Sequence, residues 1–194
     1  MRAGSSTKIL SGYSSNLSNI GEVGNVATLV IKYKGTGALF EGAHWGPNYP
    51  ILFRVETQYS NNGFSQIKTY HRGNDNSPSY EPYVSEASND NEWNALVVTF
   101  DNINGHYSLY LNGNLLIDYD YTPSSFVSDN MQWVSGKHPS GGPNYFNGLI
   151  KHLTIYNAIL TEEEIVSFTN TNSYFNYDTW ANWDFNQGSG NTLY

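Results

Sequence analysis

Residues 93–119 read WNALVVTFDNINGHYSLYLNGNLLIDY, and this stretch decides the fold class of the chain. Its first part, Trp93–Phe100, is a nearly continuous apolar run, which is typical of a central strand covered on both faces. The segments Tyr107–Leu111 and Leu115–Tyr119 then flank Asn112-Gly113, a dipeptide that accepts the positive φ angles of a two-residue hairpin turn. The stretch therefore predicts successive antiparallel strands.

The rest of the chain repeats this pattern of short strands separated by turn residues. Further strands are predicted at Val26–Lys34, Ala38–Glu41, Ile51–Tyr59, Phe64–Tyr70, Met131–Val134 and Gly148–Tyr156. We expect Gly35-Thr36-Gly37 to end the first of these strands and Asn61-Asn62-Gly63 to form a hairpin turn. The polar stretch Arg72–Glu92 exceeds the usual loop length, so we expect it to be functional or partly stranded.

One helix is predicted near the C-terminal end. Thr161-Glu162-Glu163-Glu164 fits a capping box, with Thr161 as N-cap and Glu164 reaching back to its amide. Ile165 and Phe168 lie three residues apart and would pin this short helix to the sheets. Strands do not alternate with helices, which disfavours a parallel α/β fold. The predicted fold class is all-β, an antiparallel β-sandwich or jelly roll with one short C-terminal helix.

The composition excludes several classes of function. The 194 residues carry a net charge of −8, and Lys and Arg do not cluster, which disfavours nucleic-acid binding. No apolar run approaches the roughly 20 residues of a transmembrane helix, so we expect no membrane insertion. Cysteine is absent, which excludes disulfides, metal–thiolate sites and cysteine catalysis. The N-terminal residues lack the apolar segment of a secretory signal.

Three motifs carry a resemblance to a known family. They are Trp93–Asp101 (WNALVVTFD), Tyr107–Gly113 (YSLYLNG) and Phe146–Ile150 (FNGLI), the last followed by Ile155–Ile165 (IYNAILTEEEI). In order and spacing the chain resembles the laminin-G-like group of the concanavalin A-like lectin/glucanase superfamily over roughly residues 26–168. Lys151-His152 stands where that group usually has an acidic pair. The resemblance implies a concanavalin A-like jelly roll with lectin-like binding.

The predicted domain spans residues 26–194, and residues 1–25 form an N-terminal arm or edge strand. Trp180–Asn191 resembles the opening strand of such a domain rather than its end. It is either the first strand of a following repeat or a C-terminal strand, at about 180–186, that closes the sheet. We expect the second arrangement, because residues 1–25 lack an equivalent and an orphan Trp-rich strand would expose apolar surface.

No catalytic residue is predicted. Glucanases of the superfamily carry paired carboxylates in an E-x-D-x-x-E arrangement, because two carboxyl groups must flank the glycosidic bond. The nearest candidates here, Glu86, Asp90 and Glu92, have the wrong spacing and lie in a loop-like segment. The five histidines lack the spacing of a zinc site, and a G-x-S-x-G elbow is missing. Polysaccharide hydrolase or lyase activity therefore ranks last.

The resemblance implies calcium as a candidate ligand, because many laminin-G-like domains bind it through oxygen atoms. Asp101-Asn102-Ile103-Asn104 and Asp75-Asn76 are the candidate donors, with the ligands unassigned, and no cofactor is required. Such Asx turns are also common without a metal.

Aromatic residues in loops predict a carbohydrate site, because flat rings stack on the apolar face of a pyranose. The candidate ligand-binding residues are His44, Trp45, Asn48, Tyr49, Tyr70, His71, Arg72, Tyr80, Tyr83, Trp133, His138 and Tyr145. Core or loop packing is instead predicted for Trp93, Tyr110, Tyr156 and Trp183.

Two hypotheses about function follow. The first is a non-catalytic carbohydrate-binding or adhesion module that binds a polysaccharide or glycan outside the cell. The second is a virion or surface structural protein, such as a fibre or capsid decoration, whose sandwich docks neighbouring structural protein subunits. The chain is accordingly expected in an extracellular setting or at a virion surface.

Overall fold

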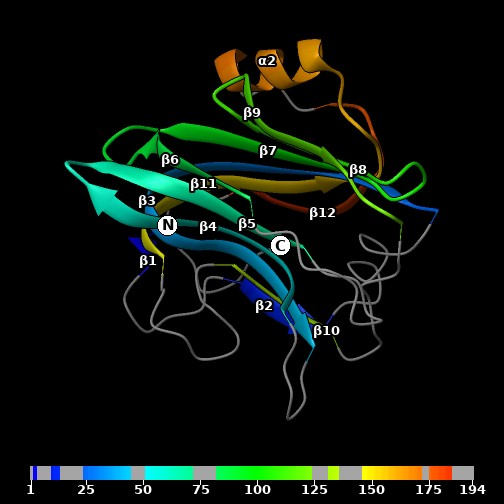
Figure 1. Cartoon of the computed structure of the whole chain (residues 1–194), viewed down its shortest axis with the longest axis horizontal. Helices are drawn as coiled ribbons and strands as arrows, with labels where there is room; N and C mark the ends of the chain where they lie inside the picture. The colour runs from blue at the N-terminus through cyan, green and yellow to red at the C-terminus, as the bar shows by residue number, and fades with distance from the viewer. Residues whose placement is uncertain are drawn as a thin grey trace.

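The computed structural model describes residues 2–3, 10–13, 24–44, 51–71, 82–123, 131–135, 146–171 and 175–184. These residues form two antiparallel sheets that stack face to face, with one helix lying over the outside of one sheet (Figure 1). The strands are β1 (Arg2–Ala3), β2 (Leu10–Tyr13), β3 (Val26–His44), β4 (Ile51–Asn61), β5 (Phe64–His71), β6 (Tyr83–Asn89), β7 (Asn94–Asp101), β8 (His106–Leu111), β9 (Asn114–Asp120), β10 (Met131–Ser135), β11 (Asn147–Tyr156) and β12 (Thr179–Asp184). The predicted all-β sandwich with one helix is confirmed.

Sheet A has the strand order β12–β11–β3–β7–β8–β9, and β1 also pairs with β11. Sheet B has the order β2–β10–β3–β4–β5–β6. Strand β3 belongs to both sheets, because its first half pairs with β7 and β11 and its second half with β4 and β10. The short strands from residues 1–25 pair with β11 and β10, and β12 pairs with β11.

The prediction that Gly35-Thr36-Gly37 ends a strand is wrong, because β3 continues through these residues to His44. Gly35 and Gly37 have φ angles of 122° and 123°, a backbone conformation that L side chains rarely adopt. A Cβ atom on Gly35 would lie 2.2 Å from the carbonyl oxygen of Asn147 on β11. The glycines therefore allow the strand to bend from one sheet into the other while its hydrogen-bonded ladders continue.

The main core lies between the two sheets. Because side chains alternate along a strand, Leu29, Val98 and Leu109 point inward from sheet A, and Val55 and Ile67 point inward from sheet B. All five are buried, and they belong to one continuous apolar cluster. Removal of this surface from water is the main stabilising contribution to the fold.

Helix α2 (Glu162–Thr171) covers the outer face of sheet A (Figure 1). Its predicted capping box is confirmed, because Glu164 Oε2 accepts a hydrogen bond from the Thr161 amide at 2.8 Å and Thr161 Oγ1 accepts one from the Glu164 amide at 3.3 Å. The buried Ile165 and Phe168 pack against Val97 in a second apolar cluster. Strand β7 is therefore covered on both faces, as the apolar run predicts.

The prediction that the strand covered on both faces begins at Trp93 is wrong, because the side chain of Trp93 is 41% exposed. Trp93 immediately precedes β7, whose first residue is the buried Asn94. The Asn94 Nδ2 atom donates hydrogen bonds to the carbonyl oxygens of Asn89 and Glu92, which fixes the polar turn at this point. Tyr156 is buried in the core as predicted, and Tyr110 is half-buried against the second cluster.

The stretch 72–92 is partly stranded as expected, because it contains β6. The side chain of Trp183 lies outside the described residues, although its backbone pairs with Leu153 in the β11–β12 ladder. Within the described part of the chain, the helix is too short and too polar to span a bilayer.

Candidate functional site

The outer face of sheet B is polar, in contrast to the part of the outer face of sheet A that lies under α2. Directly opposite residues on paired strands share a face of the sheet. In one row Glu41 lies opposite Arg54, and Arg54 lies opposite Tyr70. The next row places Glu56 opposite Lys68 and Lys68 opposite Tyr83. In a chain with only 13% charged residues, these rows are a concentrated polar surface.

Three side chains of this face form a buried ionic cluster. Arg54 Nε donates a hydrogen bond to Glu41 Oε2 at 3.0 Å, and Arg54 Nη1 donates one to Glu56 Oε1 at 3.2 Å. Glu41 and Glu56 are fully buried, whereas the side chain of Arg54 is 12% exposed. Burial of charged groups costs free energy that pairing only partly offsets, so such a cluster is poor evidence for a purely stabilising role.

The protonation of Glu41 follows from this burial. Burial raises the pKa of the Glu41 carboxyl group to about 8, against the attraction of Arg54, and the nearby Glu56 raises it further. At neutral pH Glu41 is therefore mostly protonated, and the cluster holds one positive guanidinium beside the Glu56 carboxylate. Perturbed carboxyl groups of this kind occur preferentially at functional sites.

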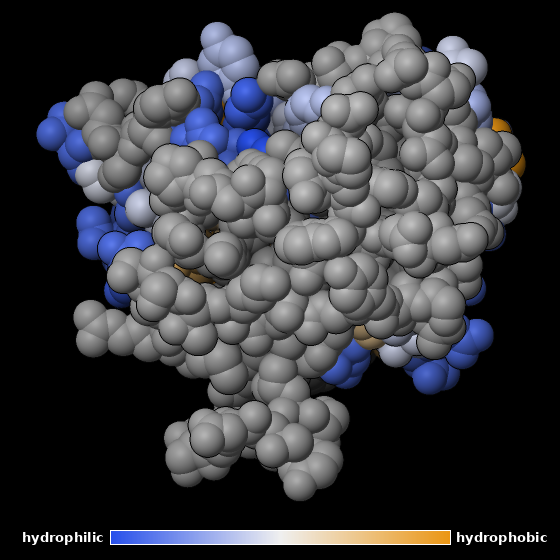
Figure 2. All heavy atoms as spheres, turned by 90° about the horizontal axis from the view of Figure 1, so that it is seen from below, coloured by the Kyte–Doolittle hydropathy of each residue, from blue (hydrophilic) through white to orange (hydrophobic). Residues whose placement is uncertain are grey.

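Two tyrosines flank the cluster on the same face. Tyr70 is half-buried beside Arg54, and Tyr83 is 61% exposed at the edge of the sheet. Figure 2 views the side of the molecule opposite α2, and most of the described atoms visible there are hydrophilic. The arrangement offers hydrogen-bonding groups with an exposed ring at the rim, which is the chemistry of a site for a polar ligand.

The structure places several predicted binding residues on sheet B. His44 ends β3 and His71 ends β5, whereas Trp133 lies in β10 opposite Gly42. Only the backbone of these three residues is described, whereas the side chains of Tyr70 and Tyr83 are also placed. The remaining candidates lie outside the described residues: Trp45, Asn48, Tyr49, Arg72, Tyr80, His138 and Tyr145.

Sequence reasoning missed the ionic cluster. The alternating pattern of β4 places Arg54 and Glu56 on the face opposite Val55. Charged side chains on such a face are by default expected to be solvated. Glu41 lies on a different strand, and only the register of β3 against β4 brings it to Arg54. The available signal was the pair of charges at Arg54 and Glu56 in a chain that otherwise contains few charged residues.

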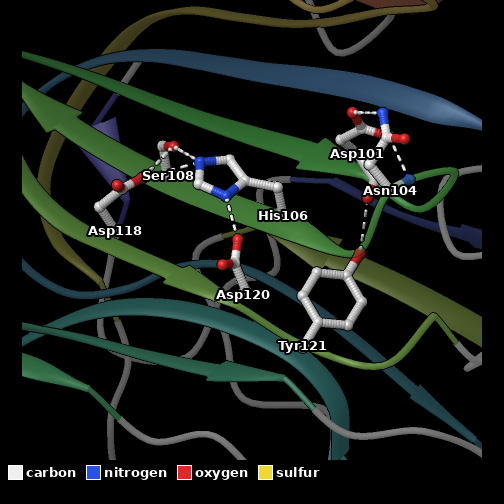
Figure 3. A network of polar contacts seen from close by, with 7 residues as sticks. All are labelled: Asp101, Asn104, His106, Ser108, Asp118, Asp120 and Tyr121. Carbon is white, nitrogen blue, oxygen red and sulfur yellow. Dashed lines mark hydrogen bonds and ion pairs between the residues drawn. The ribbon is translucent and has the colours of Figure 1, made fainter.

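A second polar cluster lies on the outer face of sheet A (Figure 3). His106 Nδ1 lies 2.7 Å from Asp120 Oδ1, and His106 Nε2 lies 3.1 Å from Ser108 Oγ and 2.9 Å from Asp118 Oδ1. A serine next to a histidine that an aspartate orients is also the arrangement of a hydrolase triad.

This second cluster lacks an activated nucleophile. Ser108 is buried, and its hydroxyl group donates a hydrogen bond to Asp118 Oδ1 at 2.7 Å. The hydrogen bond with Asp120 raises the pKa of His106, which favours the protonated imidazole. The contacts of His106 with Asp118 and Asp120 join β8 to β9.

The calcium candidates divide between described and undescribed residues. Asp101 Oδ1 accepts hydrogen bonds from the backbone amides of Ile103 and Asn104, and Asp101 Oδ2 accepts one from Asn104 Nδ2 (Figure 3). These contacts account for the side chain of Asp101 as the cap of a turn. Asp75-Asn76 lies outside the described residues. Among the residues that are described, His, Asp and Glu form no group that could hold a metal ion.

Comparison with protein families gives one match. The model of the family Laminin_G_3, described as the concanavalin A-like lectin/glucanases superfamily, matches residues 31–166 of this chain. No curated protein sequence matches this chain significantly.

Solved structures share the fold at low sequence identity. The CBM40 of the Ruminococcus gnavus IT-sialidase, bound to α2,3-sialyllactose, superposes with a TM-score of 0.63 at 19% identity and covers 84% of this chain and 96% of its own. The SAP-like pentraxin of Limulus polyphemus has a TM-score of 0.56 at 14% identity, covering 80% and 76%. Domain 4 of the arabinanase AbnA from Geobacillus stearothermophilus, in complex with arabinotriose, has a TM-score of 0.53 at 19% identity, covering 75% and 67%.

Proposed function

We propose that this chain, which belongs to the concanavalin A-like lectin/glucanases superfamily, is a non-catalytic carbohydrate-binding module. The observation that carries the proposal is the outer face of sheet B, where the cluster of Glu41, Arg54 and Glu56 lies beside two tyrosines. On the outer face of sheet A, α2 covers the apolar part. The similar structures bound to sialyllactose and arabinotriose support a glycan as the ligand.

The geometry suits a sugar in two ways. Tyr83 presents an exposed ring that can stack on the apolar face of a pyranose at little cost in conformational entropy. Glu56, which Arg54 holds in place, offers its second oxygen as an acceptor for a hydroxyl group. The predicted residues His44, His71 and Trp133 lie on strands of the same sheet.

A glycan array with the full chain tests the proposal, and isothermal titration calorimetry measures the affinity of each hit. We expect Tyr83→Ala to weaken binding about tenfold, the loss of one stacked aromatic ring. Tyr177→Ala is the matched control, because Tyr177 is also exposed but hydrogen-bonds to Glu164 of α2 on the opposite side of the molecule. An array without any hit, or equal losses in both variants, would contradict the proposal. Parallel titrations with calcium and with a chelator test the calcium candidate.

Hydrolase activity is the alternative that the raised pKa of Glu41 suggests. A carboxyl group of raised pKa beside a second carboxylate is the pattern of an acid–base pair in glycosidases. Here both carboxyl groups give one oxygen to the same guanidinium group of Arg54, whereas the two carboxyl groups of a glycosidase flank the glycosidic bond. We expect no release of reducing ends from bound polysaccharides. Release that disappears in Glu41→Gln would establish an enzyme instead.

We further propose that the module acts where glycans are accessible, outside the cell or at a virion surface. The structural alternative, a fibre or capsid decoration protein, differs in its behaviour in solution. Sedimentation at increasing concentration separates the two: ordered self-association without glycan binding favours assembly, and glycan binding by a monomer favours the module.

A further inference from the structure

The guanidinium group of Arg54 is already occupied by the protein. Its Nε and Nη1 atoms point at Glu41 Oε2 and Glu56 Oε1, at 3.0 and 3.2 Å. An arginine that recognises an acidic sugar offers two adjacent N–H groups to the carboxylate of the ligand. Arg54 instead directs two of its nitrogen atoms at carboxyl groups of its own sheet, so it is not free for such a bidentate contact.

The remaining oxygen of Glu56 requires a donor. Glu56 Oε2 is buried and has no hydrogen-bond partner among the described residues. A buried acceptor without a partner is costly, and such groups in native structures call for a ligand or an ordered water. A sugar hydroxyl group can donate to this oxygen, whereas an ionised carboxylate has no proton to give.

The electrostatic field acts in the same direction. Two carboxyl groups surround one guanidinium, and burial raises the pKa of Glu41 to about 8, so the cluster carries no net positive charge at neutral pH. The whole chain has a net charge of −8, which repels anions at long range. An acidic glycan would therefore meet neither a free arginine nor an attractive potential.

Resting on the proposed function, we infer that the ligand of sheet B is a neutral, hydroxyl-rich glycan and that the Glu41–Arg54–Glu56 cluster discriminates against acidic sugars. Glu56 Oε2 accepts a hydroxyl hydrogen bond from the glycan, and Arg54 holds Glu56 in place. In this respect the chain differs from the similar CBM40 structure, which is bound to an acidic ligand.

Matched pairs of oligosaccharides test this inference on the unaltered chain. Each pair consists of a neutral oligosaccharide and its sialylated or uronic-acid counterpart, such as lactose with sialyllactose and galactotriose with trigalacturonate. In each pair that binds, we expect the neutral member to bind at least tenfold more tightly than the acidic member. Tighter binding of the acidic members would overturn the inference but leave the proposed function intact, whereas the absence of binding to every glycan would remove the proposed function itself.

A pair of variants then locates the discrimination. Glu41→Gln/Glu56→Gln removes the negative charge beside Arg54, so we expect binding of acidic members to increase about tenfold and binding of neutral members to decrease. The control Glu162→Gln changes the net charge by about the same amount on an exposed residue of α2, because Glu41 is mostly protonated at neutral pH and Glu41→Gln removes little charge. Equal gains in the cluster variant and the control would assign the effect to net charge and overturn the role of the cluster. Unchanged neutral binding in the cluster variant would show that Glu56 Oε2 holds only a water, which also overturns it.

Discussion

Glu41→Gln is expected to remove a large part of the dependence of stability on pH. The Glu41 side chain is fully buried, and burial raises the pKa of its carboxyl group from 4.5 to about 8. Between these two values the folded protein retains a proton that the unfolded chain releases. Folding stability must therefore fall as pH rises through this window, and the fall ends above the pKa of the folded state.

The size of the effect follows from the same pKa difference. Each pH unit within the window costs about 1.4 kcal/mol, so the wild type should lose roughly 5 kcal/mol of stability between pH 4.5 and 8. That is a large fraction of the 5–15 kcal/mol that stabilises a typical domain. Glutamine has the size of the neutral carboxyl group and does not ionise, so the variant should lack this loss.

Urea unfolding at intervals between pH 4.5 and 8.5, followed by tryptophan fluorescence, measures both proteins. His106 contributes a loss of the same sign above pH 6.5, but it is present in both chains and cancels in the difference. The free energies of unfolding should diverge progressively towards pH 8, with the variant the more stable at the alkaline end. Parallel curves for wild type and variant would refute the assignment of a buried, protonated Glu41.

The remaining predictions concern the bend, the helix and the second polar cluster. Gly35→Ala should lower the free energy of unfolding by about 3–5 kcal/mol, because it combines a positive φ with a backbone clash. Gly24→Ala, which has a φ of 91° but nothing within 4 Å, should cost only about 1–2 kcal/mol, and equal urea midpoints would exclude the clash. Thr161→Ala should cost about 1 kcal/mol by loss of the N-cap, and thermal unfolding that does not change would contradict this role. The hydrogen bond with Asp120 raises the pKa of His106, so its contribution is present below pH 6.5 and lost as pH rises through the folded pKa. An NMR titration of the His106 ring that gives an ordinary pKa would contradict the pairing.

Local signals in the sequence were sufficient for most of the fold. Asn112 and Gly113 have φ angles of 51° and 81°, which is the conformation that the hairpin cue requires. The capping box of α2 was readable from Thr161 and Glu164 because its partners lie three residues apart. Trp93 shows the limit of such signals, since a continuous apolar run does not reveal which of its residues is the first to enter the sheet.

The candidate site was less predictable because its contacts are not local. Arg54 and Glu56 are two residues apart, but the first contact of the cluster joins β3 to β4 through a register that contains bulges. A bulge shifts the facing of every residue that follows it, so pattern alone could not establish that Glu41 shares a face with Arg54. The aromatic loop residues Trp45 and Tyr49 remain predictions, because they lie outside the described residues.

The two outer faces of the sandwich differ in what they contribute to stability. On sheet A, α2 seals an apolar surface that includes Val30 and Val97, and this burial stabilises the fold. On sheet B, the ionic cluster occupies positions where apolar side chains of similar volume would be as stable or more so. Stability alone therefore accounts for the face under α2 but leaves the cluster on sheet B unexplained. Binding accounts for it, because a ligand hydroxyl group at Glu56 Oε2 would provide the partner that the described residues do not supply.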